Sequence, residues 1–174
     1  SARKPLILAG GGAKTSDAEV KRLAELLDAP VVQTANARGL MHGHRLAVPA
    51  SPSLKAVRKL MADADVVIAA GTEFGPTDYD MYADGGFVVP PALIRIDIDG
   101  AQLKRRPSTI AIQADCRTAL AALCDTLGAA STGDRSGAER ARSTREAAFA
   151  EIGPAMQAQV RAVEHIRDAL PGSL

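Results

Sequence analysis

Three consecutive glycines, Gly10 to Gly12, follow the short apolar run Pro5 to Ala9 near the start of the chain. Consecutive glycines permit tight turns and let the backbone approach a phosphate group closely. A helix that follows them adds unpaired amide donors and the positive end of its dipole. The same glycines also suit a tight turn between a strand and a helix that binds no ligand. Phosphate binding and a purely structural turn both remain open.

Two specific nucleotide motifs are absent around these glycines. The stretch Gly10 to Thr15 lacks the third glycine of the dinucleotide fingerprint, and the run that ends at Thr34 has no acidic residue for a ribose hydroxyl. Ala13 stands where a Walker A loop needs glycine before its lysine. We therefore expect neither an ordinary NAD site nor ATP hydrolysis.

Histidines are the first candidates for metal binding or proton transfer, and the chain has three: His42, His44 and His165. A zinc site needs a third and a fourth ligand at short spacing, and none stands near His42 and His44. We expect no metal site in this chain.

Two pairs of aspartates could act in acid–base chemistry or in ligand binding. Asp78 and Asp80 lie in an irregular stretch, where aspartates usually cap turns. Asp97 and Asp99 end an alternating apolar run, and side chains at the carboxyl end of a strand can bind a ribose or an adenine. Capping is the competing interpretation for both pairs.

Charge and composition argue against nucleic acid and membrane partners. The chain has 21 lysines and arginines against 20 acidic residues, a net charge of +1. No overall field therefore attracts a polyanion. Aromatic residues make up 3% and tryptophan is missing, so stacking platforms for single-stranded nucleic acid are lacking.

Cysteine usage indicates a reducing compartment. Cys116 and Cys124 are eight positions apart on one expected helix, roughly 12 Å, which is too far for a disulfide. The sequence shows no signal peptide and no apolar run of the ~18 residues that a membrane span needs. We expect a soluble, cytoplasmic protein.

Short apolar runs alternate with amphipathic stretches along most of the chain. Ser16 and Glu19 have capping-box spacing before one such stretch, and Asp115 can cap another. The segments 36–53 and 73–91 show no periodicity. The alternation predicts an α/β fold, namely a doubly wound, Rossmann-like parallel sheet of about six strands with helices on both faces. Five strands are expected at Pro5 to Ala9, Pro30 to Thr34, Asp65 to Ala70, Leu93 to Asp99 and Thr109 to Ile112.

The end of the chain departs from this alternation. Residues 1–127 are expected to form the α/β domain, and the composition of 128–137 is typical of a linker. Residues 138–170 are expected to be helical, because they are rich in alanine and repeat apolar residues on one face. That apolar face, which needs a partner, contains Ile152, Met156, Val160, Val163, Ile166 and Leu170.

Four ordered segments together resemble one family, the central domain of thiamine-diphosphate-dependent enzymes of the acetolactate synthase and 2-oxo acid decarboxylase type. They cover residues 5–13, 29–40, 64–75 and 93–103. The resemblance extends to about Leu127 and implies domain boundaries at 1–127 for the central domain and 128–154 for a linker. It also implies that residues 155–174 are the first helix of a C-terminal diphosphate-binding domain.

The resemblance implies a non-catalytic fragment of a larger enzyme, and the chain indeed starts at Ser1 without a methionine. In this family the catalytic glutamate belongs to the N-terminal domain. The Gly-Asp-Gly motif, which holds Mg²⁺ and thiamine diphosphate, belongs to the C-terminal one. We therefore expect the parent enzyme to bind these cofactors and this fragment not to. Its expected partners are the missing domains, within a homodimer or homotetramer.

Flavin-carrying members hold FAD in this domain, so the resemblance implies a site for FAD or ADP. One departure weakens it: Glu73 stands where the flavin-binding synthases commonly have arginine, and an acidic side chain repels a diphosphate. The matching cofactor-binding positions are Gly10, Gly11, Gly12, Thr34, Ala35, Gly71, Thr72, Asp97, Ile98, Asp115 and Cys116.

The stretches 71–80 and 84–87 resemble decarboxylases that act on 5-guanidino-2-oxopentanoate. Two other classes of protein remain as alternatives to a domain fragment. One is a free-standing nucleotide-binding enzyme such as a sirtuin-like deacylase, although this normally needs four zinc-binding cysteines. The other is a flavin electron-transfer module of related fold.

Overall fold

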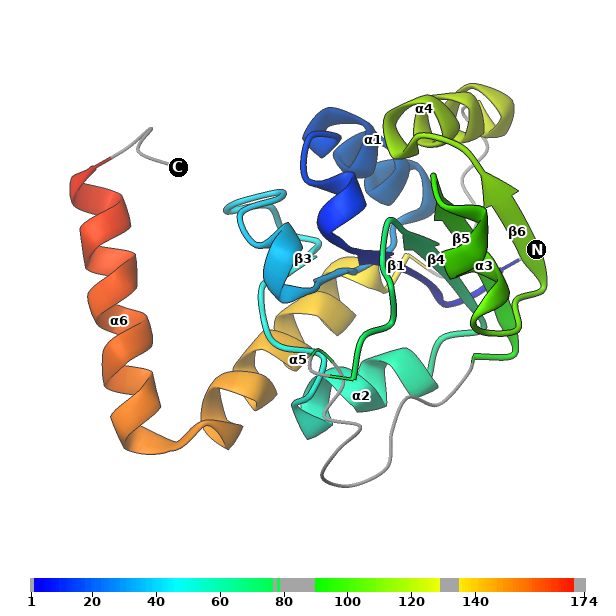
Figure 1. Cartoon of the computed structure of the whole chain (residues 1–174). Helices are drawn as coiled ribbons and strands as arrows, with labels where there is room; N and C mark the ends of the chain where they lie inside the picture. Colours follow the sequence, from blue (N-terminus) through cyan, green and yellow to red (C-terminus); the bar gives the residue numbers. More distant parts are fainter. Residues whose placement is uncertain (1, 77, 79–89, 129–134, 171–174) are drawn as a thin grey trace.

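The computed structural model describes residues 2–76, 78, 90–128 and 135–170 (Figure 1). Its centre is a six-stranded sheet in the order β3-β2-β1-β4-β5-β6, with parallel pairing throughout. The strand order reverses between β1 and β4, which is the switch point of a doubly wound fold. The predicted fold class is confirmed. The strands are β1 Pro5–Ala9, β2 Val31–Gln33, β3 Ala47–Val48, β4 Val66–Ala70, β5 Ala92–Asp97 and β6 Ile110–Gln113.

One strand was not expected. Strand β3 lies inside the segment 36–53, for which the sequence predicted no regular structure. Its two residues pair with Val31 and Val32 of β2. Two residues are too short for a periodic pattern, so this edge strand could not be recognised from hydrophobicity alone.

Helices cover both faces of the sheet and bury alternate residues of its strands. Ile7 of β1 belongs to the core under α1 and α4, whereas Leu6 and Leu8 belong to the core under α2 and α5. Figure 1 shows these two pairs of helices on opposite sides of the sheet. The helices of the body are α1 Asp17–Leu27, α2 Lys55–Ala62, α3 Gly100–Lys104, α4 Cys116–Leu127 and α5 Gly137–Glu151.

The expected capping box at the start of α1 does not form. Ser16 precedes the helix, but its side chain is buried and makes no capping hydrogen bond. The neighbouring carboxylate is used in another way, because Asp17 Oδ1 accepts a hydrogen bond from the Met41 amide at 2.6 Å. Asp115 does cap α4 as expected, and Asp99 caps α3.

Helix α5 lies within the segment 128–154 that was expected to be a linker, and it packs into the domain. Its first amide, at Gly137, donates to Asp28 Oδ2 at 2.8 Å. At its other end, Glu151 accepts hydrogen bonds from the Lys55 and Ala56 amides at 2.8 and 3.1 Å and so caps α2. The linker expectation is corrected for residues 137–151, because the small side chains of this helix let it approach α2 closely.

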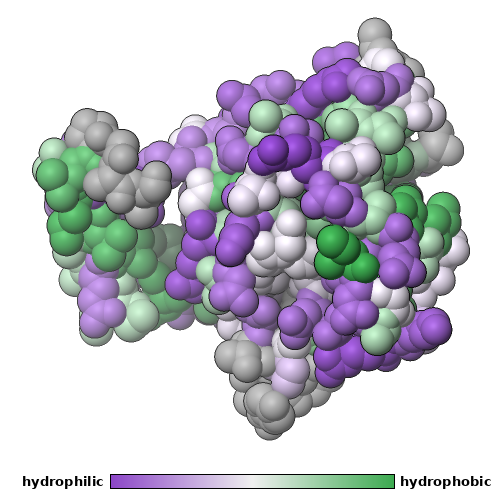
Figure 2. All heavy atoms as spheres, turned by 45° about the horizontal axis from the view of Figure 1, so that its top comes forward, coloured by the Kyte–Doolittle hydropathy of each residue, from purple (hydrophilic) through white to green (hydrophobic). Residues whose placement is uncertain are grey.

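The final helix, α6 Gly153–Ala169, stands beside the body, and none of its residues is buried (Figure 1). The expected continuous helix over 138–170 is interrupted at Gly153, whose φ of +74° turns the chain. The expected apolar face is present, and Figure 2 shows hydrophobic side chains along this helix. Met156, Val163, Ile166 and Leu170 are each at least half exposed. Within the described part of the chain, no helix combines the length and the apolar character that a membrane span requires.

Replacement of Gly137 by alanine tests the docking of α5. A Cβ atom there would lie 2.6 Å from the Asp28 carbonyl carbon and overlap its oxygen, so backbone must move. We expect Gly137→Ala to lower the free energy of unfolding in urea by about 2 kcal/mol. Gly75→Ala is the matched control, because a Cβ there meets no atom within 4 Å. Equal stability of the two variants would show that α5 does not dock against Asp28.

Candidate functional site

The predicted cofactor-binding residues come together at one edge of the sheet. Because the strands are parallel, the loops that follow β1, β2, β4, β5 and β6 all leave the sheet at its carboxyl edge. These loops carry the glycines 10–12, then Thr34 and Ala35, Gly71 and Thr72, Asp97 and Ile98, and Asp115 and Cys116.

Two of the three glycines are used to pack one loop against another. The Gly10 amide donates to the Ala70 carbonyl oxygen at 2.9 Å, and the Gly12 amide donates to the Gly71 carbonyl oxygen at 3.0 Å. A Cβ atom on Gly10 would lie 2.6 Å from the Thr72 Cα, and one on Gly12 would lie 2.8 Å from the Gly71 Cα. The amides of Gly10 and Gly12 therefore hold the loop after β4, and these glycines are required without any ligand.

Gly11 has a different environment. A Cβ atom there would lie 3.1 Å from the Asn36 Cβ, which is a tight contact with a side chain. Asn36 belongs to the short helix η2 Ala35–Ala37 that follows β2. Gly11 thus sets the distance between the loops that follow β1 and β2.

The loop after β2 is tied to the sheet and to Asp78. The Thr34 amide donates to the Ala9 carbonyl oxygen at 2.9 Å, and the Thr34 side chain is buried. The Ala35 amide donates to Asp78 Oδ1 at 3.2 Å. Asp78 thus accepts a main-chain hydrogen bond at the start of η2, far from its own turn, whereas Asp80 lies outside the described residues.

Arg95 organises the loop after β4, and sequence analysis missed this residue. It is 1% exposed, and it donates to the main-chain carbonyl oxygens of Thr72 at 3.4 Å and Leu103 at 3.3 Å. Its guanidinium group lies 4.9 Å from the centre of the Phe74 ring, a cation–π contact. Phe74 itself is buried and has a φ of +53°, a conformation that a bulky residue adopts only when its surroundings hold it. The missed signal is the charged residue in the middle of an otherwise apolar strand.

The turn after β5 places one apolar side chain in solvent. The Asp97 carboxylate is nearly buried and accepts a hydrogen bond from the Asp99 amide at 3.0 Å. Asp99 Oδ1 in turn accepts from the Ala101 amide at 2.7 Å. Between them, Ile98 is 72% exposed. Both aspartates therefore shape the turn, and Ile98 presents the apolar surface of this edge.

Asp115 and Cys116, after β6, are not suited to nucleophilic chemistry. Asp115 Oδ1 accepts from the Thr118 amide at 3.1 Å, and this hydrogen bond lowers the pKa of the carboxyl. Burial of Cys116, with further contributions from the Asp97 and Asp115 carboxylates, raises the pKa of its thiol to about 11. The thiol is therefore protonated at neutral pH. Cys116 and Cys124 are both free and buried, as the expectation of no disulfide requires.

Two cations border the glycine loop and were not recognised in the sequence. Lys14 is exposed directly after the loop. Arg117, in the first turn of α4, donates to the Thr15 carbonyl oxygen and lies 3.9 Å from Glu19. Glu73, after β4, is exposed and carries the opposite charge. The edge thus carries cations beside β1 and β6 and a carboxylate beside β4.

The two histidines in the segment 36–53 are in contact with other residues of the protein. His44 Nε2 lies 3.0 Å from Glu25 Oε1, and its Nδ1 accepts from the Leu46 amide at 3.3 Å. His42 Nδ1 lies 3.4 Å from a guanidinium nitrogen of Arg167 on α6. Among the residues that the structure describes, no three histidine, cysteine or acidic side chains are grouped as metal ligands.

Comparison with known proteins identifies the class to which this fold belongs. Residues 1–123 match the family described as the thiamine pyrophosphate enzyme central domain. The chain belongs to this family, as its resemblance predicted.

Individual relatives are much longer than this chain. A probable 2-ketoarginine decarboxylase from Pseudomonas aeruginosa is 30% identical over 173 residues, which cover 98% of this chain and 30% of that protein. A sulfoacetaldehyde acetyltransferase from Castellaniella defragrans is 44% identical over 87 residues, 43% of this chain and 13% of that protein. An acetolactate synthase from Mycobacterium avium is 32% identical over 133 residues, 73% of this chain and 21% of that protein. The chain therefore spans less than a third of the length of each.

The close contact between the loops after β1 and β4 generates a stability prediction. Gly10→Ala forces a Cβ atom into the backbone of Gly71 and Thr72. We expect a loss of about 3 kcal/mol in the free energy of unfolding in urea. Gly11→Ala meets only the Asn36 side chain, so its loss is expected to be about 1 kcal/mol. A larger loss for Gly11→Ala than for Gly10→Ala would contradict the close backbone contact at Gly10.

Proposed function

We propose that this chain is the non-catalytic central domain of a larger thiamine-diphosphate-dependent decarboxylase that acts on 2-ketoarginine, which is 5-guanidino-2-oxopentanoate. The observation that carries this proposal is the extent of one match. The similarity to the probable 2-ketoarginine decarboxylase includes 98% of the chain, whereas the similarity to the acetolactate synthase includes 73%. A match of that extent must include most of α5 and α6, which follow the central domain.

The residues of this chain do not fit the metal and diphosphate group of thiamine diphosphate. The sequence contains no Gly-Asp-Gly stretch, and the described residues form no cluster of metal ligands. We infer that other domains of the parent enzyme hold Mg²⁺ and the cofactor. The apolar face of α6, which includes Met156, Val163 and Ile166, would then be covered by the C-terminal domain that it begins.

We further propose that the carboxyl edge binds an adenine nucleotide weakly. Ile98 offers an exposed apolar surface for a planar base, and Lys14 and Arg117 stand on the side of the glycine loop where phosphates would lie. Glu73 opposes a diphosphate. We expect this repulsion to keep the affinity for both ADP and FAD low.

The substrate is tested with the complete protein that carries this chain. In the presence of thiamine diphosphate and Mg²⁺, we expect it to release carbon dioxide from 2-ketoarginine with a kcat/KM about tenfold or more above that for pyruvate. The isolated 174-residue chain is the control and is expected to release none. Formation of acetolactate from pyruvate as the main reaction would refute the substrate, and activity of the isolated chain would refute its non-catalytic role.

Nucleotide binding is tested by calorimetric titration of the isolated chain with ADP and with FAD. We expect ADP to bind with about 5 kcal/mol, a Kd in the high micromolar range. Ile98→Ser is expected to weaken it about tenfold, because the base loses its apolar contact. Ile110→Ser is the control. It removes an isoleucine that is also half exposed but lies at the amino end of β6, away from the carboxyl edge of the sheet, so the affinity for ADP should not change. Tight retention of coloured FAD by purified protein would show that Glu73 does not oppose the diphosphate.

A further inference from the structure

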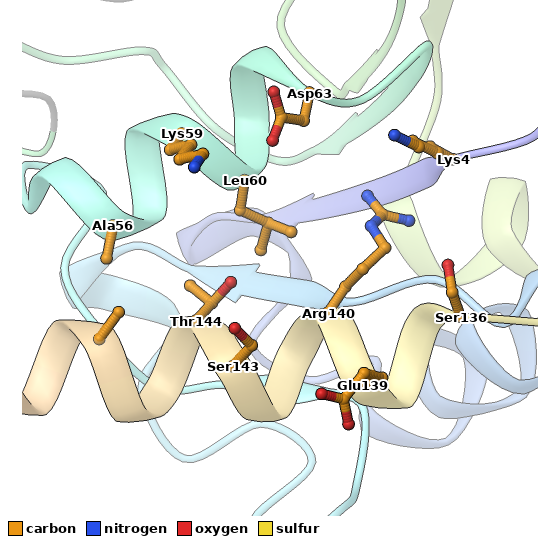
Figure 3. A pocket seen from close by; sticks show the side chains of 11 residues that line it. Lys4, Ala56, Lys59, Leu60, Asp63, Ser136, Glu139, Arg140, Ser143 and Thr144 are labelled. Atoms are coloured by element: carbon orange, nitrogen blue, oxygen red, sulfur yellow. The ribbon is translucent and has the colours of Figure 1, made fainter.

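The edge strand β3 is short and covered. Pro49 follows it directly, and Arg145 of α5 donates hydrogen bonds to the carbonyl oxygens of Ala47 at 2.7 Å and Arg45 at 3.1 Å. Figure 3 shows α5 beside α2, with which it lines a pocket on one face of the sheet. Helix α5 and the proline therefore hinder any further strand from pairing with β3.

The opposite edge strand, β6, lacks these protections within the described part of the chain. It is the last strand in the sheet order and pairs with β5 alone (Figure 1). The residues 108–114 contain neither a charge nor a proline, and Ile110, Ala111 and Gln113 are exposed. Because the peptide groups of a strand point alternately to either side, half of those in β6 point away from β5. Such an edge is a template for another strand.

The residue order of β6 suits pairing with a second copy of itself. A two-fold axis at Ala111 makes the two strands antiparallel and places Ile110 of one copy opposite Ile112 of the other. These isoleucines lie on the same face of the sheet, because alternate residues of a strand share a face. Each half-exposed Ile110 would thus gain an apolar partner across the interface, and the small Ala111 side chains would meet at the axis.

The charges at the two ends of β6 are complementary in this arrangement. Lys104 and Arg105 are exposed and precede the strand, whereas the exposed Asp99 and Asp115 lie at its carboxyl end. An antiparallel copy places the basic end of one strand beside the acidic end of the other. Arg117 also lies at the acidic end, but its guanidinium group is 3.9 Å from a carboxylate of α1 and is directed toward that helix.

We propose that the edge of β6 is a self-association surface, on which a second copy of this chain pairs antiparallel and extends the sheet across a two-fold axis. Such a contact is isologous, so the same residues serve both copies. It involves one short strand from each copy, and we therefore expect a weak dimer that forms at high protein concentration. The pairing does not depend on nucleotide binding or on the apolar face of α6.

The test measures the apparent mass of the 174-residue chain by sedimentation equilibrium. Between about 10 µM and 1 mM, the mass should rise from that of one copy toward that of two. Ala111→Glu and Ala111→Lys each place like charges opposite one another at the axis, so each should weaken association about tenfold or more. An equimolar mixture of the two variants places glutamate opposite lysine and should restore the dimer. Ala111 is exposed, so both variants should unfold at the temperature of the wild type.

A matched control distinguishes β6 from the other exposed apolar surface. Ile166→Lys adds a charge to the apolar face of α6 and should leave the association unchanged. Loss of the dimer in Ile166→Lys, with wild-type association of both Ala111 variants, would place the contact on α6 and overturn the proposal. A mixture of the Ala111 variants that stays monomeric, or a wild-type chain that stays monomeric over the whole range, would overturn it as well.

Discussion

The architecture depends on one contact between two stretches of backbone, the loop after β1 and the loop after β4. At Gly10, Gly12 and Gly71 the two loops approach so closely that no side chain fits between them. Two amide–carbonyl hydrogen bonds join the loops. This contact lies at the switch point, the place where doubly wound folds bind their ligands. It also fixes the register of the loops on either side. Arg95 continues the constraint toward β5 by binding the Thr72 carbonyl oxygen and covering the Phe74 ring.

A second set of contacts makes α5 part of the body. Asp28 ends α1 in the left-handed conformation, and its carboxylate accepts from the Gly137 amide and pairs with Arg45 at 3.2 Å. Glu151 satisfies amides at the start of α2, which has no capping side chain of its own. Each end of α5 is therefore fixed by a carboxylate that bonds to backbone amides, and its buried face consists of small residues. Helix α6 contacts the body through Arg167 and His42, but none of its residues is buried and its apolar face is exposed.

The sequence predicted the fold well because buried parallel strands are continuous apolar runs, and five of the six strands appear at the expected places. It failed where position depends on a contact distant in the chain. The two residues of β3 are too few to show a hydrophobic pattern. Helix α5 follows a stretch of glycine and serine whose composition indicated a linker and not a helix that docks onto Asp28. Ser16 has the spacing of a capping box, but burial of its side chain leaves the helix end without that bond. Arg95 was overlooked because its alternating apolar neighbours indicated a strand, and the charge in the middle of that strand was not considered as a separate signal.

These observations bear on whether the residues of the candidate site are evidence of nucleotide binding. Several residues that match the family's cofactor positions are engaged within the protein: Gly10 and Gly12 in the loop contact, Asp97 in the turn after β5, Asp115 as the cap of α4, and Cys116 in the core. Their presence alone therefore does not distinguish a domain that binds a nucleotide from one that does not, since the fold itself requires them. What differs between such domains must be the outward-facing residues that the fold leaves free to vary. Here those are Lys14, Glu73 and Ile98. Arg95 cannot take the place of a cation at Glu73, because it is buried and its guanidinium group lies over the Phe74 ring. The charge after β4 is thus negative, and the weak nucleotide binding that we propose for this edge depends on Lys14, Arg117 and the apolar surface of Ile98.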